Sequence, residues 1–147
     1  MAEEKYLKQY EKSAAGNYLL RSRGILENTI AVAAARTLTQ EESGSTILVN
    51  PASAYSITLP ADKAGLKFKF VYVASVAHIV KIDSAAANGI KGMSVDVSGA
   101  GNLIDNPAVH FVASGVVGSV VELVCDGTTW FVTAVDSGTN KIIGGAS

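Results

Sequence analysis

The strongest strand pattern in the chain lies near its C-terminal end, over residues 119–125 and 130–135, which are rich in β-branched and aromatic residues. Both faces of the first segment are apolar apart from Glu122, which is typical of a strand with cover on both sides. Asp126-Gly127 stands between the two segments, and glycine tolerates the positive φ of a tight turn. The pattern therefore predicts a β-hairpin that is buried in its own domain or lies against a partner chain.

Shorter alternating runs, bounded by turn residues, predict further strands. These runs span residues 45–50, 55–59, 66–73, 78–83, 90–97 and 109–113, and an apolar pair follows at Ile142-Ile143. The run at 78–83 is expected to pair with the run at 66–73, and residues 98–102 are expected to form a loop. Many short strands with closely spaced turns favour a mainly β fold, either an antiparallel β-sandwich or a compact β-barrel.

The N-terminal part has a different pattern. Residues 2–15 place Tyr6, Tyr10 and Ala14 on one stripe, which predicts a helix that must pack on a surface to be stable. Residues 25–36 mix helix and strand formers, and an extended segment is favoured there. The spacing of Thr39 and Glu42 then predicts a capping box and a single helical turn, which Gly44 ends. These residues are the only helical ones expected outside the N-terminal region.

Charge divides the chain in the same way. Residues 1–44 hold 12 of the 25 charged side chains, and the other 103 residues hold 13. We therefore expect a polar arm, helical and extended, over residues 1–35 and a β domain over residues 36–147.

The composition limits the classes of partner. Hydrophobic residues make up 48% of the chain, charged residues 17%, and the mean hydropathy is +0.29. Surplus apolar surface of this kind favours self-association. The net charge is −1 without a basic run, which argues against nucleic-acid binding. Neither a signal-peptide core nor an 18-residue apolar run is present, so we expect a soluble protein made in the cytoplasm, with no membrane partner.

The candidate chemical groups favour a protein that is not an enzyme. Cys125 lies within a strand and is expected to be a buried, inert thiol. His78 and His110 lack further ligands at metal spacing, so no metal or cofactor is predicted. Gly99-x-Gly101 lacks the third glycine of a dinucleotide loop. Trp130, flanked by apolar strand residues, is expected to be core rather than a sugar-binding platform.

The remaining carboxylates are expected to have structural roles. Four of them fall where turns are predicted, and aspartate in a turn caps its own backbone. They are Asp62, Asp105, Asp126 and Asp136.

Four segments carry a resemblance to a known family. They are Arg36-Thr-Leu-Thr with Glu42-Ser-Gly44-x-Thr46, then Ile57-Thr-Leu-Pro60, then Ala64-Gly-Leu-Lys-Phe-Lys-Phe-Val71, then Cys125-Asp-Gly-x-x-Trp130. In this order and spacing they resemble a β domain of structural proteins of tailed double-stranded-DNA bacteriophages. That domain occurs in small head-decoration (cement) proteins and in fibre or knob proteins. The resemblance covers about residues 36–135.

The resemblance implies a decoration protein that binds the outside of the phage head, in contact with the major capsid protein, often as a trimer. On this reading the chain belongs to the virion surface. The alternative is a receptor-binding knob or fibre-tip module of a phage tail; such fibre proteins are usually longer and carry shaft repeats, which this chain lacks. In the first case the arm is expected to attach the protein to the shell. Its candidate contact residues are Tyr6, Leu7, Tyr10, Leu19, Leu20, Arg21 and Arg23.

Overall fold

The computed structural model describes residues 10–12, 18–20, 28–74, 78–84, 89–112, 117–139 and 142–146. Within these ranges strands are the main secondary structure. The strands are β1 (Tyr10–Lys12), β2 (Tyr18–Leu20), β3 (Thr29–Val32), β4 (Arg36–Thr37), β5 (Thr46–Val49), β6 (Tyr55–Thr58), β7 (Lys67–Tyr72), β8 (Val80–Asp83), β9 (Ile90–Val95), β10 (Gly101–Asn106), β11 (Ala108–Phe111), β12 (Val120–Cys125), β13 (Trp130–Val135) and β14 (Ile142–Gly145). One 3-10 helix, η2, spans Gln40–Glu42.

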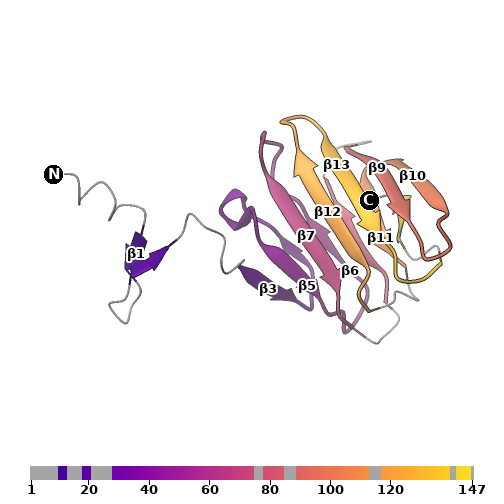
Figure 1. The fold of residues 1–147 in the computed structure, drawn as a ribbon, viewed down its shortest axis with the longest axis horizontal. Coiled ribbons are helices and arrows are strands. Elements are labelled where there is room, and N and C mark those ends of the chain that lie inside the picture. The colour runs from indigo at the N-terminus through magenta and orange to yellow at the C-terminus, as the bar shows by residue number, and fades with distance from the viewer. Residues whose placement is uncertain are drawn as a thin grey trace.

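Two sheets form a β-sandwich. The seven-stranded sheet has the order β10-β9-β13-β12-β7-β5-β3, and the five-stranded sheet has the order β14-β11-β8-β6-β4. In Figure 1 the seven-stranded sheet faces the viewer, and β6 and β11 lie behind it. The prediction of a mainly β sandwich is therefore confirmed. The expectation of purely antiparallel strands is wrong, because β13 pairs with β9, β5 with β3 and β7, and β6 with β4 and β8 in parallel.

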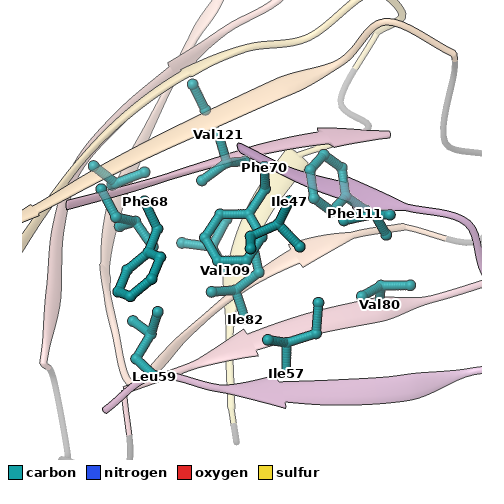
Figure 2. Packing of buried hydrophobic residues seen from close by; sticks show 14 of the residues in the cluster. Ile47, Ile57, Leu59, Phe68, Phe70, Val80, Ile82, Val109, Phe111 and Val121 are labelled. Carbon is teal, nitrogen blue, oxygen red and sulfur yellow. The ribbon is translucent and has the colours of Figure 1, made fainter. Parts of the chain in front are cut away.

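Alternation of apolar and polar residues places the core between the sheets. In β7, for example, Phe68, Phe70 and Tyr72 are buried while Lys67 and Lys69 face outward. Figure 2 shows residues of both sheets meeting in this layer: Ile47, Phe68, Phe70 and Val121 from one sheet, and Ile57, Val80, Ile82, Val109 and Phe111 from the other. Each fully buried side chain of this size stabilises the fold by about 1.5–3 kcal/mol relative to an exposed one.

The predicted hairpin is the centre of the seven-stranded sheet. β12 and β13 pair antiparallel from Cys125↔Trp130 to Val120↔Val135. Gly127 has φ of 111° in the turn, which a side chain would strain. Because its partners are adjacent in sequence, this hairpin is specified by local signals alone.

Two buried hydrogen bonds tie the sheets together. The Tyr55 hydroxyl of β6 donates to the Val32 carbonyl of β3 at 2.7 Å. The Ser94 hydroxyl of β9 donates to the Ile142 carbonyl of β14 at 2.9 Å. Burial raises the pKa of Tyr55 to about 12, so its hydroxyl remains a donor over the physiological pH range.

Two sequence-based predictions about strands are wrong. β8 pairs with β6 and β11, not with β7, because the connection between β7 and β8 crosses from one sheet to the other. The expected loop over residues 98–102 ends early: β10 begins at Gly101 and pairs with β9 along its whole length. Asp105 consequently lies in a strand rather than in the predicted turn.

The N-terminal arm differs from its prediction. The predicted helix over residues 2–15 lies mostly outside the described residues, but the part that is described forms β1, so the helix prediction is wrong there. β1 pairs antiparallel with β2 in a separate two-stranded sheet. β3 pairs with β5 and buries Val32, so the sandwich begins at about Asn28 rather than at Arg36.

Candidate interaction surfaces

Two of the family-like segments, residues 64–71 and 125–130, meet around Trp130. The indole is fully buried, its centroid lies 6.0 Å from that of Phe68, and its Nε1–H donates to the Asp62 carboxylate at 2.7 Å. The backbones of Leu66 and Cys125 are joined by a hydrogen bond of 2.8 Å. The prediction that Trp130 and Cys125 belong to the core is confirmed, and Asp62 is the polar partner that a buried indole needs.

The turn beside Trp130 is stabilised by Asp126. Its carboxylate accepts hydrogen bonds from the backbone N–H groups of Thr128 at 2.9 Å and Thr129 at 2.8 Å. These bonds hold the pKa of Asp126 below its usual value. The aspartate therefore has the predicted capping role.

The capping box at η2 is also confirmed. The Glu42 carboxylate accepts the Thr39 N–H at 2.8 Å and forms an ion pair with Arg36. Gly44, with φ of 87°, then lets its N–H donate to the Lys67 carbonyl at 2.8 Å. The residues of the family-like segments thus serve mainly to hold turns and to close the core.

Only some of the predicted arm contacts fall within the described backbone. Tyr10 pairs with Leu20 between β1 and β2, and Leu19 pairs with Glu11. The other candidates, Tyr6, Leu7, Arg21 and Arg23, lie outside the described residues. The structure therefore brings Tyr10 and Leu20 to neighbouring strand positions.

The outer face of the seven-stranded sheet carries an apolar row that the sequence did not predict as a whole. The row crosses β9, β13, β12, β7 and β5 at one level of the sheet. Its members are Val95, Val135, Val120, Val71 and Leu48. Val135 is 61% exposed, and elsewhere on the same face Leu103 is 84% and Phe131 49% exposed. The sequence contained one indication of this surface, because some predicted strands are apolar on both faces. The row itself depends on the order of the strands in the sheet, which this pattern does not determine.

Two cross-strand ion pairs lie beside this row. Lys69 of β7 and Glu122 of β12 stand opposite each other with nitrogen and oxygen 3.5 Å apart. Lys91 of β9 and Asp105 of β10 are 3.3 Å apart. All four side chains are about half exposed, so the pairs contribute little to folding and remain available to a partner.

A shallow depression of about 210 Å³ adjoins the first of these ion pairs. Gly44, Ser45 and Thr46 form one side of it, and strands β7 and β12 form the floor and the other side. The remaining lining residues are Lys67, Phe68, Lys69, Glu122, Leu123 and Val124. The absence of a side chain at Gly44 leaves this side open, since an added Cβ would meet no atom within 4 Å.

The His110 side chain has structural surroundings. The His110 ring donates from Nε2 to the Ala146 carbonyl at 3.0 Å, and burial of the ring lowers its pKa from the ordinary value of 6.5. Among the side chains that the structure describes, no group of three or more His, Cys, Asp or Glu residues is placed to hold a metal ion.

Comparison with protein-family models and with curated proteins finds no match. In the described parts of the chain, no helix has the length and apolar character required to cross a membrane.

Proposed function

We propose that this protein is a capsid decoration protein that binds the outside of a bacteriophage head and stabilises it. The observation that carries the proposal is the ordered set of segments between Arg36 and Trp130 that resembles the β domain of such proteins. The geometry of these segments is consistent with a rigid module, because they fix the turns and close the core at one end of the sandwich. The proposed role is structural rather than catalytic.

In this proposal the arm makes the contact with the major capsid protein. Tyr6, Leu7, Tyr10, Leu19 and Leu20 supply apolar anchors, and aromatic residues are favoured in the centres of interfaces. Arg21 and Arg23 pair with carboxylates at the rim, where such pairs add little affinity but set orientation. The β domain then remains on the shell surface as an oligomer and braces neighbouring subunits.

Binding to bare phage shells tests this function. Shells that lack the protein are mixed with the purified full chain, sedimented, and heated to record the temperature at which they open. We expect saturable binding and a higher opening temperature. Failure to bind shells, together with binding to host cells, would contradict the proposal and support the receptor-binding alternative.

A further inference from the structure

The charges at the centre of the seven-stranded sheet are self-complementary. Glu122 and Lys69 occupy the same level on the neighbouring strands β12 and β7. We consider a two-fold axis that lies on the outer face of the sheet, parallel to the strands and midway between β12 and β7. Rotation about this axis places β12 of a second copy over β7 of the first, and β7 of the second copy over β12 of the first. It places Glu122 of one copy opposite Lys69 of a second copy, and Lys69 opposite the second copy's Glu122, which gives four alternating charges with none left unpaired.

The same axis pairs the apolar row with itself. Val120 lies opposite Val71 of the second copy, and Val135 lies opposite the second copy's Leu48, as the strand registers require. Val120, Val71 and Leu48 are already half buried, and Val135 is 61% exposed. Pairing of this row therefore removes apolar surface from water. One level beyond the Glu122 pair, Val124 lies opposite Lys67 of the second copy, where the methylene stem of the lysine can cover the valine.

The same two-fold rotation places a side chain of the second copy over the depression beside Gly44. Phe131 of β13 lies at the level of Val124 and Lys67, and the hydrogen bond from Gly44 to Lys67 puts Gly44 at that level too. The axis brings Phe131 of each copy over Gly44 of the other. A half-exposed aromatic ring thus faces the open side of a depression of about 210 Å³.

We propose that two copies of this chain pair face to face through the outer face of β13, β12, β7 and β5, around this two-fold axis. The face carries two lysines, Lys67 and Lys69, and one glutamate, Glu122, so its net charge is too small to favour a strongly acidic or basic partner. A two-fold axis shifted to lie between β9 and β13 would set Glu122 against Leu103 and leave the carboxylate without a partner. The pair is isologous and so differs from the trimer that the family resemblance implies.

Complementary charge reversal tests the proposal on the full chain. The variants Glu122→Lys and Lys69→Glu each place like charges across the axis. Each should raise the dimer dissociation constant at least about tenfold, because juxtaposed like charges at an interface cost several kcal/mol. Mixing the two variants should restore pairing as a heterodimer, since positions 69 and 122 are then both basic in one copy and both acidic in the other. Sedimentation equilibrium and native mass spectrometry measure both effects.

Leu103→Glu is the matched control. Leu103 is the most exposed of the large apolar side chains that the structure describes, but it lies on β10, outside the proposed contact. The control should leave the dimer dissociation constant within about twofold of the original, and unchanged melting of every variant would show that each is folded. A monomeric parent chain, a trimer that the charge reversals do not affect, or loss of association in the Leu103 variant alone would overturn the proposal.

The proposal is independent of the phage assignment, because the pairing is measured on the free protein. Failure to bind shells would leave the two-fold pair intact. Loss of the two-fold pair would leave shell binding through the arm intact.

Discussion

At the scale of single residues, Trp130 connects parts of the chain that lie far apart in the sequence. Its ring packs on Phe68, and its Nε1–H reaches Asp62, 68 residues earlier. The sequence predicted the burial of this residue because it begins an alternating strand next to a tight turn. It did not predict Asp62 as the partner, since that contact depends on how the turn before β7 folds over the hairpin.

We predict that Trp130→Ala lowers the free energy of unfolding by about 3–5 kcal/mol, as truncation of a buried aromatic side chain does. Chemical denaturation measures the loss. The matched control is Val97→Ala, a truncation at a side chain that is 68% exposed, which should change the stability by less than about 0.5 kcal/mol. An unchanged unfolding midpoint for Trp130→Ala would contradict the account of this end of the core.

His110 gives the fold a dependence on pH. Burial, assisted by the nearby positive charge of Lys81, lowers the pKa of the ring in the folded state, although the Ala146 carbonyl and Asp83 oppose the shift. The unfolded state therefore binds the proton more readily. The contribution of His110 to stability is full above the unfolded pKa of about 6.5 and is lost as the pH falls toward the lowered folded pKa.

We predict that His110→Gln removes this contribution to the pH dependence while a glutamine amide can still donate toward Ala146. The measurement is the unfolding free energy of the original chain and of the variant from pH 8 down to pH 5. Below about pH 6.5 the original chain should lose stability relative to the variant. A difference that is constant over this range would refute the assignment.

At the scale of the elements, local patterns were sufficient where the turn and strand signals are strong. The β12–β13 hairpin, the capping box at η2 and the burial pattern of β7 all follow from signals within a few residues. The pairing of the consecutive strands β9 and β10 was missed, because β10 begins within a Gly-rich loop and its pairing with β9 outweighs the weak strand preference of Gly101 and Asn102. Pairings between distant segments were not predictable from local patterns, and β8 joins the opposite sheet.

The parallel pairing of β9 with β13 depends on one glycine. Gly92 stands opposite Val132 with φ of 150°, and an added Cβ would lie 2.0 Å from the Val132 carbonyl oxygen. We predict that Gly92→Ala destabilises the domain by about 2–3 kcal/mol, because the strand must shift to relieve a clash with backbone. The measurement is again chemical denaturation.

The control for this substitution is Gly101→Ala. An added Cβ at Gly101 meets the flexible end of Met93 at 3.3 Å and the Ser94 carbonyl oxygen at an ordinary contact distance of 3.8 Å, so this change should cost less than about 1 kcal/mol. Equal losses for the two variants would show that the close approach of Gly92 to β13 is not what fixes these strands.

At the scale of the whole molecule, the sequence separated an arm from a sandwich but placed the boundary too late. Asn28 belongs to the sandwich: its side chain donates to the Ser45 hydroxyl at 3.1 Å and its carbonyl accepts the Thr46 N–H at 2.8 Å. The charge density that marked residues 1–44 does not reveal this, because β3 is short and its residues carry no charge.

We predict that deletion of residues 1–27 leaves a folded domain that melts within a few degrees of the full chain but binds bare phage shells much more weakly. The reason is that the deletion ends before Asn28, the first of the described residues that bonds to the sandwich. The matched control retains the arm and carries Leu103→Glu on the sheet, and it should bind shells as the full chain does. Aggregation of the truncated protein, or a melting temperature many degrees lower, would show that the arm is part of the core.

We propose that this protein decorates a phage head, and its copy number in the purified virus particle tests this proposal most directly. Quantitative mass spectrometry of particles, with the major capsid protein as the internal reference, gives the ratio. The account predicts a copy number in constant proportion to the major capsid protein, on the order of hundreds per particle, since shell proteins repeat over a closed symmetric lattice. A handful of copies per particle would contradict it and indicate a tail appendage.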